Sequence, residues 1–391
     1  MLSSGVRFIH PLFAIPADAQ RKIFPDETLS VLEFLQFSLP NISGAAPQKQ
    51  ASAFWSQHEP NIQEIEEIRK IPLPPAETLA ELVNKCKTAV SSGTNSIRCP
   101  HVPSGSGWNL PMWIIAYWAE VLELRRTHRK AWVKAEEFLR CGMKLWKSSS
   151  SGETVDKVMQ EAYDVLSYLP WSGNICGFDD NEPLHTLATY ASRAWLSTLH
   201  ENQMLDLLRC DLLLARSNIE IGNMAFFTTL RKAYDHRDTG EYDESNYFAR
   251  TRSIAQALET GQRDGFGTMV HINGDHWVAI ALDFKNSLIW YGDSFGKAAV
   301  EDVTSVVNWW TFHHTGREFA YRKMKISAQK DSFSCGLLGI NGLGHFYMPE
   351  KYPLIDVAWV DVERVRVLLR VVQRHLDQAD VSPIGLNNCS C

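Results

Sequence analysis

The N-terminal part of the chain carries apolar residues at the spacing of amphipathic helices. Shorter helical patterns lie around residues 27–37 and 75–89, and Asn109 with Pro111 indicates the start of a long helix through Leu139. The next helix ends at Pro170 and is predicted by apolar residues three and four positions apart, namely Val155, Val158, Met159, Ala162, Val165, Leu166 and Leu169. Residues 1–170 are therefore predicted to form a mainly helical domain.

The C-terminal part, residues 171–391, mixes strand and helix patterns. Two stretches rich in apolar, β-branched and aromatic residues, 269–283 and 287–295, are bounded by Asn-Gly and Lys-Asn-Ser turn signals and predict strands. The pattern then predicts a helix over 300–313, a strand over 319–326, a helix at Cys335 and an amphipathic helix over 360–376. We expect a second domain in which a sheet packs against helices.

Composition narrows the class of protein. A chain of 391 residues with 13 Trp is long enough for two domains and can build a sizeable core. Its formal net charge of −6 argues against a general nucleic-acid-binding protein, which is usually basic. The apolar run at 113–118 is cut by Glu120 and is too short to cross a bilayer, so no membrane partner is expected. His10 and two prolines interrupt the apolar N-terminus, so we expect no signal peptide and an intracellular location, nuclear or cytoplasmic.

The eight cysteines are scattered and form no CxxC pair or regular framework. Neither a zinc site nor a disulfide scaffold is predicted, and no metal or cofactor is expected. Basic residues gather on the long helix, where they form either a solvated face or a patch for an anionic partner; they are Arg125, Arg126, Arg129, Lys130 and Lys134.

The candidate chemistry centres on Cys335. Gln329 lies six residues before it and Gly336 directly after it. A thiolate nucleophile needs a donor for the oxyanion nearby, and a Gln one short loop upstream can supply it. A thiol at the start of a helix has its pKa lowered by the helix N-terminus, and its own backbone N–H becomes a second donor.

A base is expected on the neighbouring strands. His276 lies in the first predicted strand and Asp293 ends the second, so pairing of strands about 4.8 Å apart brings the carboxylate to the imidazole. His271 competes as the base, but strand alternation places it on the opposite face. Asp283 and Asp275 compete as the acid; Asp283 ends the histidine strand itself, and Asp275 points away.

In this order, His-Asp-Gln-Cys, the chain resembles the ubiquitin-like-modifier-specific cysteine proteases typified by the SUMO proteases. The resemblance covers roughly residues 185–350, and its matching elements are Trp195-Leu196, His276-Trp277, Asp293-Ser294, and Gln329 with Cys335-Gly336. It implies an α+β fold, with a central mixed sheet flanked by helices, behind the helical N-terminal domain.

The resemblance also implies an activity. The chain would hydrolyse the bond after the C-terminal Gly-Gly of a SUMO-like modifier, in a precursor or at an isopeptide link, with the modifier and its conjugates as partners. Trp277 would roof, and Trp195 would line, a channel that admits only the Gly-Gly tail; the alternative for both is core packing. In SUMO proteases Asn-Asp usually follows the Trp-Leu and the Asp grips the modifier, whereas Ser197-Thr198 stands here.

Three other functions stay compatible with these motifs. The modifier can be ubiquitin or the neddylation modifier. An acetyltransferase of the same clan would usually carry Glu as the orienting acid, and a non-enzymatic module would bind the modifier without cleaving it.

The channel interpretation makes a further prediction about the backbone. Strand alternation points Trp277 away from His276 unless the strand ends or bulges, so an irregularity is predicted at Asp275–Trp277, where Gly274 permits one.

Overall fold

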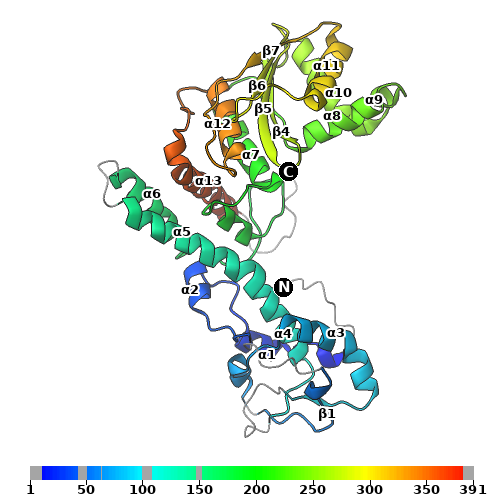
Figure 1. Cartoon of the computed structure of the whole chain (residues 1–391), viewed down its shortest axis with the longest axis vertical. Coiled ribbons are helices and arrows are strands. Elements are labelled where there is room, and N and C mark those ends of the chain that lie inside the picture. Colours follow the sequence, from blue (N-terminus) through cyan, green and yellow to red (C-terminus); the bar gives the residue numbers. More distant parts are fainter. Residues whose placement is uncertain (1–10, 43–50, 63, 99–107, 147–151, 382–391) are drawn as a thin grey trace. The chain divides into compact units, whose positions relative to one another are not determined.

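Short β-branched and aromatic runs in the C-terminal half assemble into one mixed sheet. The computed structural model describes residues 11–42, 51–62, 64–98, 108–146 and 152–381. The sheet has the order β3-β4-β5-β6-β7, formed by β3 (Ile219–Ile221), β4 (Gly265–Ile272), β5 (His276–Asp283), β6 (Leu288–Gly292) and β7 (Ala320–Lys323). Strands β4, β5 and β6 are antiparallel, and β3 and β7 pair in parallel with β4 and β6 (Figure 1).

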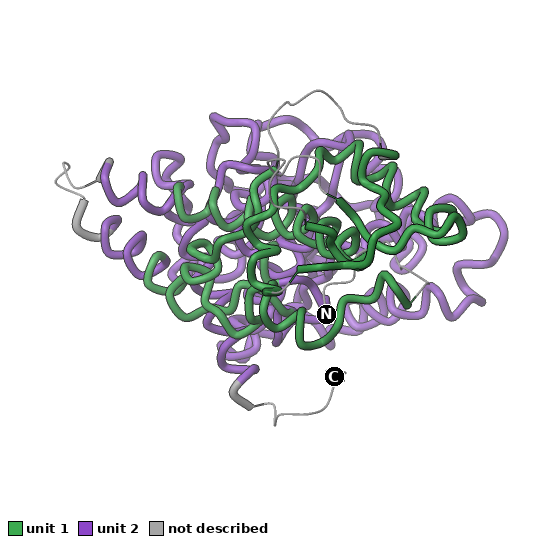
Figure 2. Tube along the Cα trace, turned by 90° about the horizontal axis from the view of Figure 1, so that it is seen from below, with its two compact units in different colours: residues 1–137, 163–173, 184–186 green, residues 138–162, 174–183, 187–391 purple. Residues whose placement is uncertain are grey.

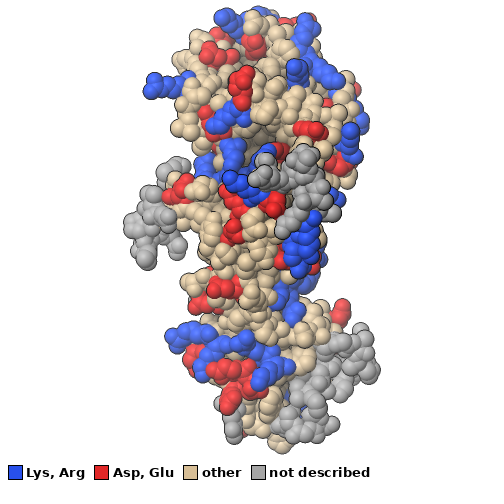
Figure 3. All heavy atoms as spheres, turned by 90° about the vertical axis from the view of Figure 1, so that its left-hand side faces the viewer, with Lys and Arg blue, Asp and Glu red and all other residues tan. Residues whose placement is uncertain are grey.

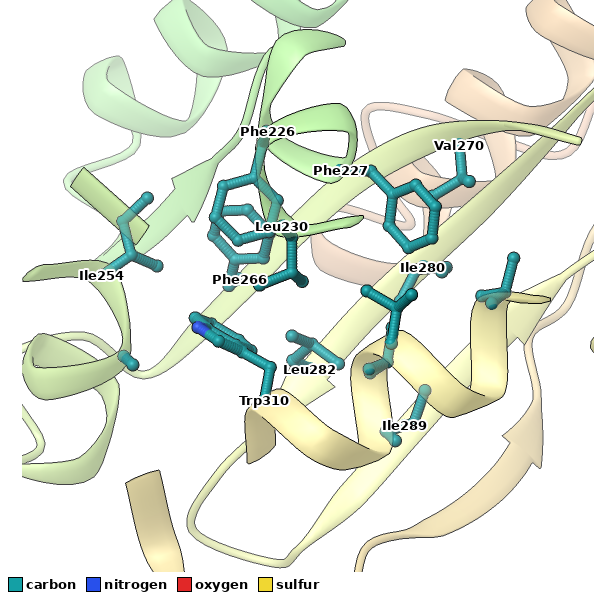
Figure 4. Packing of buried hydrophobic residues seen from close by; sticks show 14 of the residues in the cluster. Phe226, Phe227, Leu230, Ile254, Phe266, Val270, Ile280, Leu282, Ile289 and Trp310 are labelled. Atoms are coloured by element: carbon teal, nitrogen blue, oxygen red, sulfur yellow. The ribbon is translucent and has the colours of Figure 1, made fainter. Parts of the chain in front are cut away.

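One face of the sheet is covered by α8 (Ala225–Asp235), α10 (Ala249–Glu259) and α11 (Glu301–Thr315). Phe226 and Leu230 of α8 and Trp310 of α11 pack over Phe266 and Ile280 of the sheet (Figure 4). Side chains two apart on a strand share a face, so alternate apolar residues of β4, β5 and β6 all contribute to this core. The core fixes the strand register, because a one-residue slip would turn each strand over.

The opposite face is covered by α12 (Cys335–Tyr347), which packs mainly on β5 and beside α7 (Thr198–Leu214). A Cβ at Gly339 would lie 2.3 Å from the methyl carbon of Met269 in β4, so the glycine lets the helix approach the sheet closely. Helix α13 (Val360–Val381) packs on α7. A mixed sheet with helices on both faces is the α+β architecture that the sequence predicted.

The N-terminal residues form a mainly helical unit. Its helices are α1 (Ala17–Ile23), α2 (Val31–Gln36), α3 (Ala76–Ser91), α4 (Ile114–Leu124) and the first part of α5 (Lys130–Trp146), beside a short pair of strands, β1 (Trp55–Ser56) and β2 (Ser96–Ile97). Trp118, Trp132 and Trp171 are fully buried, and the ring of Trp171 stacks on Phe34 at 4.2 Å. Large aromatic side chains therefore supply much of this core.

The long helix predicted from Asn109 to Leu139 is interrupted by a π-helical turn, Arg125–Arg129, between α4 and α5. Three of the basic residues named above, Arg125, Arg126 and Arg129, lie in this turn. Arg125 donates to the carbonyl oxygens of Leu39 and Pro40, and Arg129 donates to those of Leu35 and Phe37. The guanidinium groups of Arg125 and Arg129 therefore hold the end of α2 and the segment after it. The sequence had suggested only a solvated face or a patch for an anionic partner.

Contacts divide the chain into two units (Figure 2). Unit 1 holds residues 1–137, 163–173 and 184–186, and unit 2 holds residues 138–162, 174–183 and 187–391. The sequence placed the boundary at residue 170 instead. The end of α5 and most of α6 (Gly152–Val165) belong by their contacts to unit 2, because Met159 of α6 packs at Gly142 of α5.

Charges of both signs are interspersed on the face shown in Figure 3. Ion pairs within unit 2 include Arg193 with Asp361 at 2.8 Å and Arg231 with Asp302 at 3.1 Å. In the described part of the chain, no helix combines the length and apolarity that crossing a membrane would need. Nor do the described residues contain a cluster of three or more His, Cys, Asp or Glu able to hold a metal ion.

Candidate active site

The predicted strand over 269–283 is a hairpin, so the prediction of a single strand was wrong. β4 ends at Ile272 and β5 begins at His276, because Asn273 and Gly274 take the left-handed backbone angles of a tight turn, with φ of 55° and 78°. Asn-Gly is a strong local signal for such a turn. His276 therefore opens a strand instead of lying inside one. The turn covers residues 273–275, and His276 and Trp277 pair regularly with Ile272 and His271, so the strand has no bulge between His276 and Trp277.

His276 and Asp293 meet because β5 and β6 pair. Ala279 lies opposite Gly292, and Asp293 follows directly after that last residue of β6. The imidazole Nε2 and the carboxylate Oδ1 are 3.0 Å apart, and both side chains are buried. The backbone N–H of Phe295 donates to the same Oδ1 at 2.7 Å.

This contact defines the free nitrogen of the ring. When Nε2 carries the proton that Asp293 accepts, the lone pair of neutral imidazole is on Nδ1. The His276 Nδ1 is buried and has no hydrogen-bond partner among the described residues. The ring of Phe295 stacks on the imidazole at 4.8 Å and covers it. Asp293 thus holds the ring at Nε2, and Nδ1 remains available to accept a proton.

Cys335 is the first residue of α12 and is buried. The indole N–H of Trp195 donates to its Sγ at 3.3 Å. Burial raises the pKa of the Cys335 thiol, whereas hydrogen bonds from the Trp195 indole and from the backbone of Trp277 and Gly336 lower it. The Trp277 peptide follows His276 directly, so this contact brings the thiol close to the start of β5, while the His276 Nδ1 has no hydrogen-bond partner among the described residues.

Gln329 lies between the Asp293 segment and the nucleophile loop. Its backbone N–H donates to the Ser294 carbonyl at 2.8 Å, and its Oε1 accepts from the Ser294 hydroxyl at 2.7 Å. Its Nε2 donates to the carbonyl oxygen of Asp331 at 2.9 Å. The amide donor that the sequence assigns to the oxyanion is therefore engaged with Asp331 in this structure. An oxyanion role requires that this amide turn toward bound substrate.

The two tryptophans assigned to the channel differ in exposure. Trp277 is 3% exposed, its indole N–H donates to the Leu196 carbonyl, and its ring lies 4.2 Å from that of His271. Trp195 is 37% exposed, and its ring centre lies 6.2 Å from that of Trp277. A hollow of about 360 Å³ is lined in part by Trp277, His271 and Thr198, and Trp195 is not among its lining residues.

Sequence reasoning missed two residues at this site. Phe295 was read only as the end of a strand, although the pairing that brings Asp293 to β5 also places Phe295 over His276. Asp331 accepts hydrogen bonds from the backbone N–H groups of Phe333 and Ser334 and thereby shapes the loop before Cys335. An Asp that precedes a helix by a few residues commonly caps its backbone, so this signal was present in the sequence.

Chemically, the arrangement places a buried thiol, an imidazole with a free nitrogen and a buried carboxylate in one region. The N–H of the first residue of a helix has no partner inside the helix, so the Cys335 N–H is an available donor for developing negative charge. The Trp195 indole is a second donor beside the sulfur. This set of groups suits nucleophilic attack by a thiolate on a carbonyl.

The chain is similar to known proteins over only part of its length. No protein-family model matches the chain. Over 71 residues the chain is 35% identical to a protein of Acanthamoeba polyphaga mimivirus that is named a thiol protease; the match covers 17% of this chain and about a quarter, 24%, of that protein.

Solved structures similar to the chain include two of the SUMO protease Ulp1. The form with its catalytic cysteine oxidised to a sulfenic acid has a TM-score of 0.42 and 14% identity, and the alignment covers 56% of this chain and 93% of that one. The protease domain in complex with Smt3, the yeast orthologue of SUMO, has a TM-score of 0.40 and 18% identity, with 58% and 96% covered. The Xanthomonas campestris effector XopD bound to ubiquitin has a TM-score of 0.30 and 17% identity, with 44% and 90% covered.

Proposed function

We propose that this chain is a cysteine protease that cleaves after the C-terminal Gly-Gly of a ubiquitin-like modifier, processing precursors or releasing the modifier from lysine side chains. The observation that carries the proposal is the 3.0 Å contact of His276 with Asp293, together with the buried thiol of Cys335, which the backbone of Trp277, the residue after His276, contacts. The 71-residue similarity to a named thiol protease supports the reaction class. The choice of a SUMO-like modifier rests on the four sequence motifs.

In this reaction Cys335 attacks the carbonyl of the terminal glycine as a thiolate. His276 takes the thiol proton on Nδ1 and later returns it to the leaving amine, while Asp293 holds the ring through Nε2. The Cys335 N–H and the Gln329 amide stabilise the oxyanion. Water then attacks the thioester, with the same histidine as base, and regenerates the thiol.

The proposed specificity is steric. The Trp195 indole contacts the thiol, and its ring centre lies 6.2 Å from that of Trp277; two flat rings bounding a narrow path would admit residues that have no side chain. Glycine at both positions before the cut then follows from exclusion of larger residues, not from hydrogen bonds to them. Ser197-Thr198 leaves the SUMO-like modifier less well supported than the Gly-Gly tail, so a deubiquitinase or deneddylase is the second candidate.

A panel of modifiers that carry a C-terminal propargyl group tests the proposal. Each is offered to the pure full-length chain, and covalent capture is read as a mass increase on Cys335. We expect capture of one modifier, no capture by Cys335→Ser, and retained non-covalent binding of that modifier by the Ser variant, since an alcohol is far less acidic than a thiol. Failure of every probe with the wild-type chain, with binding retained, would instead mean a non-enzymatic binding module.

A further inference from the structure

A carboxyl group with no assigned role lies beneath the nucleophile. Glu201, in the first turn of α7, is 0% exposed, and neither of its oxygens has a hydrogen-bond partner among the described residues. A Cβ built on Gly336 would lie 1.8 Å from its Oε1, so the carboxyl group packs directly against the backbone of the residue after Cys335. A side chain at this position would require the Glu201 carboxyl group to move.

Few charged or titratable groups surround this carboxyl. Arg364 approaches from α13, Tyr190 from the segment before α7, and Cys335 from α12. Arg364 does not hydrogen-bond to Glu201; it donates to the carbonyl oxygens of Thr189, Tyr190 and Ala194. Its Nη1 has no hydrogen-bond partner among the described residues, and the charges of Asp361, Glu201 and Asp331 act on it without direct contact. Burial raises the pKa of the Glu201 carboxyl well above its ordinary value, and Arg364 only partly opposes this.

A buried acid without a partner costs stability, so its position beside a nucleophile calls for a functional reason. The neutral form fills the space under the first turn of α12 without adding charge. The ionised form places a negative charge close to the sulfur, and its charge raises the pKa of the Cys335 thiol. Two adjacent negative charges in a buried site disfavour each other strongly.

We propose that Glu201 is a positioning residue for the nucleophile. Glu201 must stay protonated while Cys335 is a thiolate, and ionisation of Glu201 at alkaline pH disfavours the thiolate form of Cys335. The inference deepens the proposed function, on which its catalytic meaning rests. The pH range of the reaction then has an upper limit set by Glu201.

The test is alkylation of Cys335 by iodoacetamide in the full-length chain, followed by mass spectrometry of the peptide that contains it, from pH 6 to pH 10. We expect Glu201→Gln to react about tenfold faster than wild type at pH 9, the size expected of one charge at close range in a partly buried site, and at the same rate at pH 6. The matched control is Asp206→Asn, a second buried carboxyl of α7, which should follow wild type. Superimposable profiles of wild type and Glu201→Gln would overturn the inference, and so would an equal effect of the control.

Thermal unfolding gives a second readout. Because the folded-state pKa of Glu201 is raised, its contribution to stability is lost as pH rises above the ordinary Glu value toward the folded one. The Tm of Glu201→Gln minus that of wild type should therefore grow between pH 5 and pH 8. A constant difference would mean that Glu201 is not held neutral and would also overturn the inference. If the Gln variant does not fold, Glu201→Leu carries the same expectations.

Alkylation requires no modifier, so the two proposals fail separately. The expected alkylation profile without any cleavage of modifier substrates would leave the role of Glu201 intact and remove the proposed protease. Cleavage of modifier substrates, together with superimposable alkylation profiles of wild type and Glu201→Gln, would leave the proposed protease intact and remove the role of Glu201.

Discussion

At the scale of single residues, the site is held by contacts on one side of each group and left open on the other. His276 has Asp293 on Nε2 and a free Nδ1, and the Cys335 sulfur has the Trp195 indole beside it. Gln329 is the exception, because Ser294 and Asp331 occupy both ends of its amide. Its role therefore depends on a rotation that substrate would have to induce.

Replacing Gln329 with Ala separates the two possible roles of this residue. As an oxyanion donor, its loss should lower kcat by about 10²–10³ with a smaller change in KM, since the donor acts on charge that develops in the transition state. Steady-state hydrolysis of a modifier with a C-terminal fluorogenic amide measures both constants. The matched control, Ser294→Ala, removes the hydroxyl that donates to Oε1 and leaves the amide donors intact, so kcat should change little. Equal losses in both variants would assign Gln329 to loop structure alone.

At the scale of elements, the C-terminal helix α13 takes part in building the site. Arg364 is fully buried and ties α13 to the carbonyl oxygens of Thr189, Tyr190 and Ala194, in the segment that ends at Trp195. Its guanidinium also lies 5.6 Å from the ring of Phe333, in the loop before Cys335. The helix that follows the catalytic motifs in sequence thus holds the indole that contacts the thiol.

Arg364→Lys should disturb this connection even though the charge is kept. An ammonium cannot reproduce the planar set of donors that reaches three carbonyl groups, and a hydrogen bond to a charged group contributes about 1.5–3 kcal/mol. We expect a free energy of unfolding lower by about 2 kcal/mol or more, measured by urea denaturation, and a fall in kcat larger than any change in KM. Arg366→Lys, on the exposed side of the same helix, is the control and should change neither. An unchanged kcat in the Arg364 variant would limit α13 to a packing role.

At the scale of the whole molecule, the two units carry different buried histidines. In unit 1, burial is the main cause that lowers the pKa of His128 to about 4, and it also lowers the pKa of His185, whose ring lies 4.2 Å from that of His128. In unit 2, burial chiefly lowers the pKa of His314 to about 4. A histidine with a lowered folded-state pKa stabilises the fold above its ordinary pKa, and this contribution is lost as pH falls toward the folded value.

Unit 1 should therefore lose stability between about pH 6.5 and pH 4, with a slope of up to about 1.4 kcal/mol per pH unit for each buried histidine. His128→Phe keeps an aromatic ring and removes the titrating group, so the acid transition of unit 1 should move to lower pH. Tryptophan fluorescence during acid titration follows the unfolding, because Trp132 and Trp171 are buried in this unit. His58→Gln, an exposed site of the same unit, is the control. An acid transition that does not move would contradict the assignment.

The sequence by itself determined the local elements and the order of the chemical groups. Apolar periodicity and turn residues predicted the principal helices and a sheet around the site, although the stretch 269–283 was predicted as one strand where the structure has parts of β4 and β5, and they placed a mainly helical region before an α+β domain. Both signals act within a few residues, so a single sequence contains all the information needed to read them. The same local chemistry marked Cys335 at the start of a helix and Asp293 at the end of a strand, where the structure has them.

Only the tertiary structure decided how distant groups meet. The Trp195 indole and the Cys335 sulfur are 140 residues apart in sequence, and Arg364 reaches carbonyl groups up to 175 residues away. Pairing of this kind depends on how helices pack on the sheet, and the pattern of one segment does not contain that information. The buried position of Glu201 has the same origin: its helix alone presents a carboxyl group, and the packing of α12 on α7 covers it. Glu201 therefore becomes a candidate for a functional role only in the folded structure, where its carboxyl group is removed from water.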